Sequence, residues 1–430
     1  MATKLKDVEN EFAKYIAFKD PHVLKMIFAT TFGNSFNQEG NPLWLIIIAP
    51  SSGGKSTVIA PISGIGGAYF VDDMTDKTLM SGFKVGGKEY SLLKIINKGM
   101  IVHSDFTAIL KKNPQTRAEI LSQYRMVFDG VFVKHTGSGK ITWNGRIGFL
   151  AAATPEIYHE LEAERSMGER FSYFEMQVPN DQEIAKKIAS VGMSSKAITA
   201  AMSPVFHAYY DDFKEWLERK FDGVLPPLKI SDERLEEAMD STIFCVNAKT
   251  TVHLDFKSKA VDRIPNKASV GRDHKMALDY LKVLMAMEMY EKDTLDVEVS
   301  DEMLLVIKRM SFSSMNRERR KILEILCMAE EGERLTASEI GTRNNLGFQK
   351  EAVEMYLNPL NAMNIVQKEI GGKGNAHKWF VKSEKTRAFV LEMVKYVDNS
   401  LPEKEDEGVE KLLNNDDESP WDSLENDPWS

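Results

Sequence analysis

The chain has 430 residues, of which 43% are apolar, so it is long enough for two or three domains with hydrophobic cores. Its net charge is −9, but residues 403–430 alone hold eleven acidic residues and two Lys, which leaves 53 charges of each sign in residues 1–402. The chain contains no apolar run of about 18 residues, no signal-peptide core and no Cys or His spacing typical of zinc sites. These features exclude a membrane-spanning, disulfide-rich or zinc-finger protein. We expect a soluble, cytoplasmic protein, whose balanced body can still carry local basic surfaces for nucleic acid.

Residues 1–40 are predicted to form a helical segment. Apolar side chains such as Val8 and Phe12 recur at helical spacing over residues 5–32. Between residues 41 and 180, short apolar runs alternate with helical patterns, which indicates an α/β nucleotide-binding core. The strands expected in this core are 45–48, 68–71, 100–103 and 147–153, with a helix over 117–128 and a hairpin whose arms are 130–134 and 140–143.

A phosphate-binding loop directly follows the first predicted strand. Residues 49–57 read Ala-Pro-Ser-Ser-Gly-Gly-Lys-Ser-Thr, the pattern of such a loop with Ala49 in place of the usual first Gly. The two Gly residues allow the backbone to curl so that successive N–H groups point at one phosphate, and the following helix adds its positive end. Lys55 is expected to reach the β- and γ-phosphates, and the Ser56 hydroxyl to bind Mg²⁺. The residues expected to bind ATP are Ser52, Gly53, Gly54, Lys55, Ser56 and Thr57.

A carboxylate at the end of the third strand is the candidate acid of an ATPase. Asp105 follows the apolar run 100–103, but its neighbours are Ser104 and Phe106 rather than a second acid. Asp105 could bind the metal ion while another residue activates water, or it could be the catalytic base with Ser104 in the metal position. A third reading is that it simply caps the strand.

Two further polar residues have positions that suit catalysis. Thr154 closes the apolar run 147–153, where a polar side chain can orient the attacking water beside the γ-phosphate, or can cap the turn before Pro155. Arg170 lies in a turn before another apolar run, which suits either an arginine finger or a surface salt bridge.

The order of these motifs resembles the AAA+ core of minichromosome-maintenance-type helicases. In those helicases the sequences Ala-Ala-Ala-Asn-Pro and Ser-Arg-Phe-Asp occupy the places of residues 151–155 and 168–171 here. The chain is also similar to a family of phage and mobile-element P-loop ATPases, often labelled helicase or primase-helicase. The matching residues are 104–107, 128–130, 136–140, Trp143 and 168–171. The resemblance covers roughly residues 40–178.

The resemblance implies a role for each matching residue. Lys55 and Ser56 would hold phosphate and Mg²⁺, Asp105 would be the acid of its strand, and Thr154 would be the sensor where the helicases have Asn. Arg170 would act on the nucleotide of a neighbouring subunit, which implies a homo-oligomeric ring, expected to be hexameric. Arg272, with Arg263 as its rival, would be a second sensor.

The rest of the chain divides into four parts. Residues 181–312 are mostly helical and are expected to form a lid or linker, and residues 313–385 combine three helices with a β-hairpin, a pattern typical of a winged helix. Within that region, Thr336 and Glu339 form a capping box that opens a helix. A terminal helix is expected over 386–402, and the acidic residues 403–430 are expected to be disordered. The fold class is therefore α/β, an AAA+ P-loop NTPase core with a helical lid, a C-terminal winged helix and a disordered acidic tail.

Several basic side chains are candidates for contacting DNA. In the helicases the matching hairpin projects into a central channel, where basic residues would track the phosphates of single-stranded DNA without reading sequence. The winged helix could bind DNA through its wing or mediate protein contacts instead. Trp421 and Trp429 suggest that the tail docks on a replication protein or mimics DNA. The candidate DNA-binding residues are Lys134, His135 and Lys140 in the hairpin and Lys373 and Lys378 in the wing.

Two functions are consistent with these features. The first is a ring-forming ATPase that couples ATP hydrolysis to DNA translocation or unwinding in phage or mobile-element replication. The second is a nucleotide-gated DNA-binding initiator or helicase loader that does not unwind DNA, which the missing second acid favours. A remodeller of proteins is a third possibility.

Overall fold

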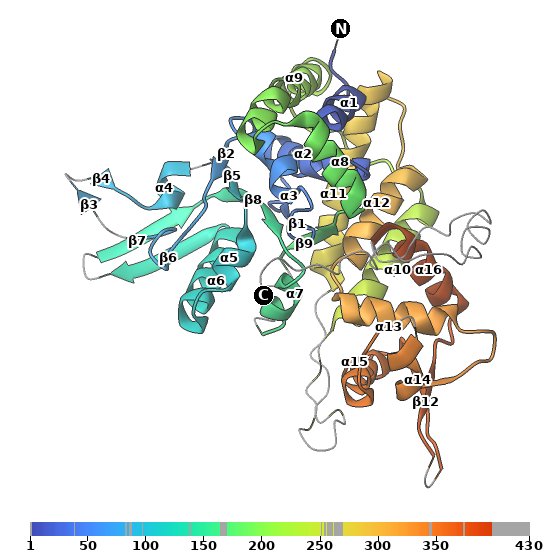
Figure 1. The fold of residues 1–430 in the computed structure, drawn as a ribbon. Coiled ribbons are helices and arrows are strands. Elements are labelled where there is room, and N and C mark those ends of the chain that lie inside the picture. Colours follow the sequence, from blue (N-terminus) through green and yellow to red (C-terminus); the bar gives the residue numbers. More distant parts are fainter. Residues whose placement is uncertain are drawn as a thin grey trace, which may run out of the picture. The chain divides into compact units, whose positions relative to one another are not determined.

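The centre of the fold is a parallel sheet of five strands in the order β2-β5-β8-β1-β9 (Figure 1). These strands are β2 (Ala68–Phe70), β5 (Lys98–His103), β8 (Arg146–Ala153), β1 (Trp44–Ile48) and β9 (Ser172–Glu175). Strands β1 and β8 are buried on both faces, which explains why each reads as a continuous apolar run rather than as an alternating one. The computed structural model describes residues 2–37, 39–81, 84, 85, 88–96, 98–136, 139–163, 170–250, 252, 255, 261, 270–343, 346–372 and 375–397.

Alternate side chains of β1 enter two separate hydrophobic cores. Leu45 and Ile47 pack with the first core, whereas Trp44 and Ile46 pack with the second. Most of the helical residues in the first core come from α1 (Leu5–Tyr15), α2 (Pro21–Phe36), α3 (Lys55–Ile59), α9 (Ser195–Phe221), α11 (Val270–Lys292) and α12 (Asp301–Phe312). The helices contributing to the second core are α4 (Leu92–Ile96), α5 (Phe106–Leu110), α6 (Pro114–Phe128) and α7 (Ile157–Ala163). The sheet is therefore the middle layer of a three-layer α/β/α arrangement.

The prediction of one helical pattern over residues 5–32 is wrong at its centre. The chain forms α1 and α2 with a non-helical segment between them. Pro21 is the first residue of α2, where its missing N–H costs nothing, and the Asp20 side chain caps the helix by accepting from the backbone N–H of His22 at 3.2 Å. The break makes residues 16–20 a non-helical connection, and residues 16–19 of it line a cavity beside the carboxyl end of β1.

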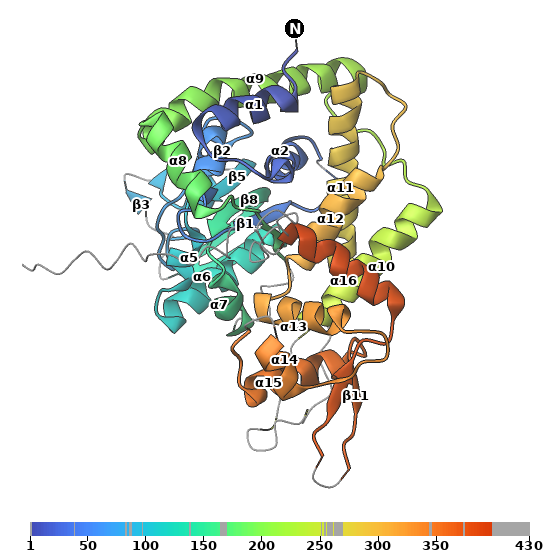
Figure 2. The ribbon, with the colours of Figure 1, turned by 45° about the vertical axis from the view of Figure 1, so that its right-hand side comes forward.

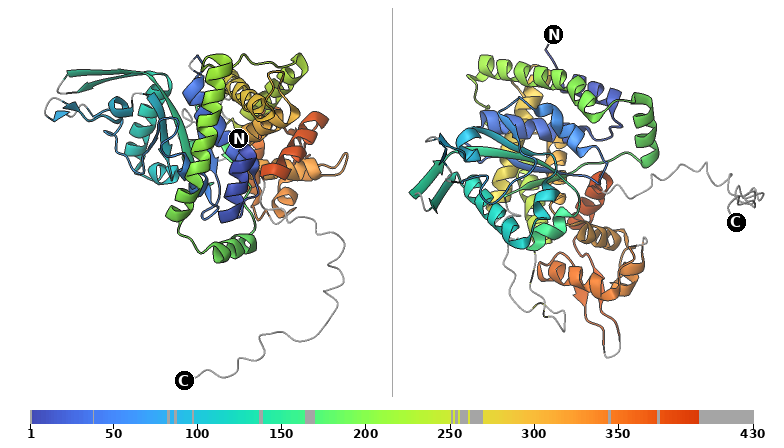
Figure 3. Two further views of the ribbon diagram at one scale, coloured as in Figure 1. Left: turned by 90° about the horizontal axis from the view of Figure 1, so that it is seen from above. Right: turned by 60° about the vertical axis from the view of Figure 1, so that its left-hand side comes forward.

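The predicted strands and the hairpin of the core are confirmed. The hairpin consists of β6 (Val131–Thr136) and β7 (Gly139–Asn144), and it extends away from the sheet on the side opposite α9 and α11 (Figures 1 and 3). Strand β9 and a second small hairpin, β3 (Lys84–Val85) with β4 (Lys88–Glu89), are additional elements that the pattern does not predict. One further short helix, η1 (Ala60–Ile62), follows α3.

The region expected to be mostly helical contains α8 (Asp181–Val191), α9, α10 (Asp232–Lys249), α11 and α12. Helix α8 begins at an Asn180–Glu183 capping box and ends at Gly192, whose φ of 60° is the left-handed conformation usual after a helix. Helix α11 packs against α2, and α12 packs against β9, so both cover the face of the sheet that carries the first core. No helix in the described ranges is long and apolar enough to cross a membrane.

Residues 317–397, which we call the C-terminal module, have a hydrophobic core of their own. The module contains α13 (Arg317–Met328), β10 (Leu335–Thr336), α14 (Ala337–Thr342), α15 (Lys350–Ala362), β11 (Gln367–Glu369), β12 (Lys378–Phe380) and α16 (Glu384–Val397) (Figure 2). Its strands form a sheet in the order β10-β12-β11, and the predicted Thr336–Glu339 capping box is present. Its buried apolar residues form a third cluster, which also takes in Cys245 and Ala248 of α10, Phe312 of α12 and Met315. The predicted tail, 403–430, lies outside the described residues.

Candidate functional site

A cavity of about 390 Å³ opens beside the carboxyl end of β1. Four segments line it: the predicted phosphate loop with the first residues of α3, the connection between α1 and α2, the residues after β9, and one side of α8 with the start of α9. Its volume falls within the range of roughly 300–1,000 Å³ usual for small-molecule sites. In an open α/β sheet, ligands bind at this edge, outside the carboxyl ends of the strands.

The backbone of the predicted phosphate loop has the curled conformation expected from its sequence. Ser52 and Gly54 both have positive φ, at 65° and 79°, with Gly53 between them in the ordinary range. The Gly53 N–H donates to the Pro50 carbonyl at 3.1 Å and tightens the turn. Such alternation turns successive N–H groups toward one point and makes a concave anion site. The unusual left-handed conformation of Ser52, a residue with a side chain, is the kind of strain found at binding sites.

Lys55 and Ser56 lie where the loop passes into α3. The Lys55 side chain is largely buried and its Nζ is 3.4 Å from the Pro50 carbonyl oxygen, a long contact that a stronger acceptor could replace. The Ser56 hydroxyl donates to the carbonyl of Ser104 at 3.1 Å. Ser56 is thereby held one residue away from Asp105, although the two are far apart in the sequence.

The ends of β5 and β8 meet beside this loop through a pair of threonines. Asp105 caps α5 by accepting the Thr107 backbone N–H at 3.0 Å through Oδ1. The Thr154 backbone N–H donates to Thr107 Oγ1 at 2.8 Å, and the two hydroxyls are 3.3 Å apart. The structure thus brings Asp105 and Thr154 to one edge of the sheet and shows that Thr107, which the sequence reasoning missed, joins them.

The electrostatics of the cavity favour an anion. Lys19, Lys55 and Lys187 are among its lining residues, which include no Asp or Glu. Within the described part of the chain, the Lys187 side chain has no hydrogen-bond or ion-pair partner given by the structure, and it projects from the face of α8 that also carries Ile184 and Ile188. Helical spacing alone could have identified this face of α8, but not the surface that it opposes.

The wall away from the phosphate loop is apolar. Its side chains come from the connection between α1 and α2, from the residues after β9, and from α8 and the start of α9. They are Tyr15, Ile16, Phe18, Val178, Ile184, Ile188, Val191 and Ile198. Helix α8 contributes several of them although none of its residues, all of which the structure describes, is buried, and Ile188 is 68% exposed. An aromatic or apolar ligand group bound here would cover surface that the protein leaves open to water.

The residues present fit a hydrated magnesium ion better than a metal held by protein alone. The described residues contain no group of three or more His, Cys, Asp or Glu side chains that could hold a metal ion. Ser56 and Asp105 offer one hydroxyl and one carboxylate at the same edge, and Mg²⁺ usually completes such a site with water and phosphate oxygens.

Two predicted arginines lie elsewhere in the chain. Arg170 precedes β9, and because β9 runs parallel to β1, it lies at the sheet edge opposite the phosphate loop. Its guanidinium pairs with Asp129 at 3.1 Å. Arg272 is in the first turn of α11 and does not line the cavity, so the structure gives no support for a contact with nucleotide within one chain. Its rival, Arg263, is outside the described residues.

The candidate DNA-binding residues differ in how free they are. His135 and Lys140 are exposed and face each other across the β6–β7 hairpin, whereas Lys134 donates to the Met80 carbonyl at 2.8 Å. Nearby Arg146 is structural, because its guanidinium donates to four backbone carbonyls and burial lowers its pKa to about 10. In the C-terminal module Lys378 is exposed on β12, and Lys373 lies outside the described residues.

No protein-family model matches the sequence, and a search of curated proteins finds no match to it. A function for this chain must therefore be inferred from the geometry of the cavity and of the sheet edge beside it.

Proposed function

We propose that this chain is a ring-forming AAA+ ATPase that couples ATP hydrolysis to movement along DNA. The observation that carries the proposal is the cavity itself. One end is a curled loop ending in Lys55 and Ser56, the other is an apolar wall, and its lining contains lysines but no carboxylate. A nucleoside triphosphate with Mg²⁺ has both the anionic and the flat apolar parts that such a cavity accepts.

The sheet order supports an AAA+ core. One strand, β8, lies between β1, which leads into the phosphate loop, and β5, which ends at Asp105. This order sets Thr154 at the end of the intervening strand, between the loop and the acid, where the proposed reaction needs it. In the proposed reaction, Lys55 neutralises phosphate charge, Asp105 serves the metal side or the water, and Thr154 orients water.

The position of Arg170 supports assembly into a ring. Within one chain it is at the opposite sheet edge from the phosphate loop, so an arginine-finger role requires a neighbouring subunit's nucleotide. Its pairing with Asp129 would then be exchanged for a phosphate on assembly. In a ring of this kind the β6–β7 hairpin would line the channel and offer His135 and Lys140 to single-stranded DNA.

The C-terminal module is proposed to be a winged helix. Its elements follow one another in the order α13, β10, α14, α15, β11 and β12, which gives three helices and a small β10-β12-β11 sheet. Helix α15 begins with Lys350 and Glu351 and carries little positive charge, while Lys368 lies 5.0 Å from the centre of the Trp379 ring. The module therefore suits a protein partner or a limited contact with DNA phosphates better than sequence reading in a groove.

A nucleotide-gated initiator or loader is the second candidate. The neighbours of Asp105 are Ser104 and Phe106, so the second acid of a fast ATPase is missing from this strand end. The Ser104 carbonyl is already bound by the Ser56 hydroxyl. A strand-displacement assay separates the candidates. DNA binding that depends on nucleotide, without unwinding, would favour the loader.

The test of the nucleotide site is Lys55→Ala, with Lys98→Ala as its control. Lys98 is an exposed lysine at the other end of a sheet strand and should leave activity unchanged. Lys55→Ala should abolish DNA-stimulated ATP hydrolysis, and hydrolysis that survives in this variant would refute the assignment. Arg170→Ala should retain nucleotide binding but lose turnover, and mixing it with Lys55→Ala subunits should restore part of the activity if the arginine acts between subunits.

A further inference from the structure

Two segments that line the cavity, residues 15–19 and 176–179, adjoin buried carboxylates that belong to one network of charged groups. Lys19 lines the cavity, and the next residue, Asp20, is 1% exposed. On the other wall, Met176 and Gln177 line the cavity, and the preceding Glu175 is also 1% exposed. A buried carboxylate is retained only with strong partners, and each of these two has them.

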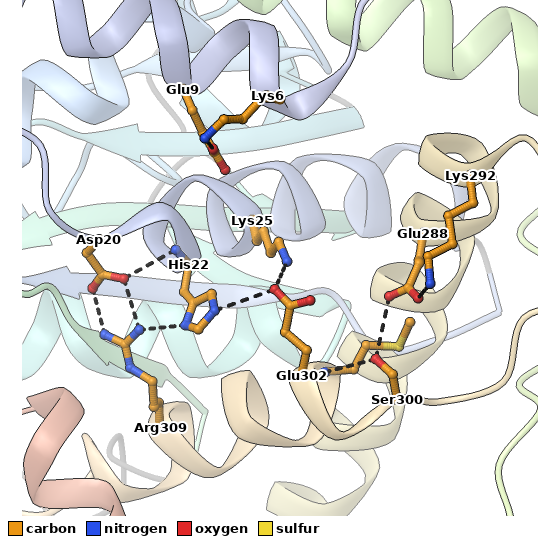
Figure 4. Close-up of polar contacts among 11 residues, drawn as sticks. Lys6, Glu9, Asp20, His22, Lys25, Glu288, Lys292, Ser300, Glu302 and Arg309 are labelled. Carbon is orange, nitrogen blue, oxygen red and sulfur yellow. Dashed lines mark hydrogen bonds and ion pairs between the residues drawn. The ribbon is translucent and has the colours of Figure 1, made fainter.

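Asp20 is bound by Arg309 of α12 (Figure 4). The two guanidinium N–H groups donate to the two carboxylate oxygens at 2.9 and 2.6 Å, a bidentate pair in which both side chains are 1% exposed. The Gln177 backbone N–H donates to the same carboxylate at 3.0 Å, so Asp20 joins the two walls of the cavity directly.

The same groups reach α16 of the C-terminal module. Arg309 donates to the Tyr396 carbonyl at 3.2 Å, and the Gln177 side-chain amide donates to the Lys395 carbonyl at 2.9 Å. These carbonyls belong to the last turn of α16, where backbone oxygens have no partner within the helix. The end of α16 is therefore held by groups that also shape the cavity.

Glu175 makes the corresponding connection to α13. Its carboxylate accepts from Arg317 Nε at 2.7 Å and also pairs with Arg320 and with the Tyr158 hydroxyl. The Glu175 backbone N–H donates at 3.0 Å to the hydroxyl of Ser313, the residue that directly follows α12. Glu175 thus contacts the first turn of the C-terminal module, and the next residue in the chain, Met176, lines the cavity.

We propose that this network couples occupancy of the cavity to the packing of α13 and α16. Apolar contacts tolerate small shifts, but hydrogen bonds weaken steeply with distance and angle, so a displacement of residues 15–19 or 176–179 changes the hold on both helices. A ligand that fixes these segments stabilises the ends of α13 and α16. By linkage, a partner that engages the C-terminal module changes the affinity of the cavity by the same factor. The inference deepens the proposed function, on which it rests, by assigning a regulatory route to the nucleotide site.

Hydrogen–deuterium exchange of the full chain, with and without a non-hydrolysable ATP analogue and Mg²⁺, tests the coupling. Peptides covering residues 50–58 report nucleotide binding, and peptides covering 384–397 report α16. We expect saturating analogue to slow exchange in both regions, in α16 by about fivefold or more, the lower end of usual couplings.

Three variants sharpen the test. Gln177→Met removes the bond to Lys395 but keeps the backbone contact to Asp20, and Glu175→Gln removes the charge that holds α13. With the analogue raised in each variant to the concentration that gives full protection of residues 50–58, the slowing in α16 or α13, respectively, should fall at least by half. Lys385→Ala, which breaks a surface pair between α16 and Asp240 of α10, should respond as the unaltered protein does.

The outcomes separate this inference from the proposed function. Protection of residues 50–58 with unchanged exchange in α16 and α13 of the unaltered protein would overturn the coupling and leave the nucleotide site standing. Undiminished slowing in both Gln177→Met and Glu175→Gln would also overturn it. If the analogue protects neither region, the proposed function and the coupling fail together.

Discussion

Replacing Arg309 by methionine should destabilise the protein strongly without touching the phosphate loop. Arg309 and Asp20 are each 1% exposed, and they are joined by two hydrogen bonds of 2.9 and 2.6 Å (Figure 4). Arg309→Met fills a similar volume but leaves the Asp20 carboxylate buried without its cation. Removing one partner of a buried pair costs about 3–5 kcal/mol, so we expect a loss of this size in the free energy of unfolding.

The double variant Asp20→Leu/Arg309→Met gives an internal check on this reasoning. Replacing both charges removes the unpaired carboxylate and should recover part of the loss. Recovery should be incomplete, because the backbone N–H groups of His22 and Gln177 also donate to Asp20 and would each lose a partner, at about 1–3 kcal/mol per buried group.

Urea unfolding followed by tryptophan fluorescence measures these differences. Lys385→Met is the matched control, because it breaks an ion pair whose lysine side chain is 75% exposed and should change the free energy of unfolding by about 1 kcal/mol or less. If Arg309→Met costs no more than the Lys385 control, the buried pair does not stabilise the fold and the argument is refuted.

Three further results are expected. Burial, and then the nearby guanidinium, lower the pKa of His22 to about 4 from 6.5, so the unfolded chain takes up this proton first as the pH falls. Stability should therefore be lost between about pH 6.5 and pH 4, by roughly 1.4 kcal/mol per pH unit for this residue, and His22→Gln should flatten urea-unfolding free energies over that window. Lys187→Ala should weaken binding of a fluorescent ATP analogue about tenfold, whereas Lys186→Ala, on the same helix but outside the cavity lining, should not, and equal affinities would remove Lys187 from the site. Gly54→Ala should weaken the same binding, because φ of 79° costs a residue with a Cβ about 1–2 kcal/mol although no atom lies within 4 Å of the added carbon, and unaltered affinity would show that the loop rearranges on binding.

Local sequence patterns predicted the strands of the central sheet and the capped helix at Thr336, because short stretches of sequence specify these elements. A buried strand followed by Gly53 and Gly54, and a capping box at Thr336, depend on neighbouring residues alone. The pattern missed the break at residues 16–20, because the apolar spacing of α1 and α2 continues across it while Pro21 and its Asp20 cap interrupt the helix. That break then supplies one wall of the cavity, which no local pattern could indicate.

The sequence by itself determined that a curled Gly-rich loop ending in Lys55 and Ser56 follows a buried strand, and that Asp105 and Thr154 stand at strand ends. Tertiary structure alone decided which of these strands are neighbours, and so brought Ser56, Asp105 and Thr154 to one edge and left Arg170 at the other. It also decided the arginine partners of Asp20 and Glu175, which lie more than a hundred residues away in the chain. The physical reason is that a charge pattern shows that a carboxylate exists, whereas only the packing of distant elements determines whether it is buried and which cation it meets.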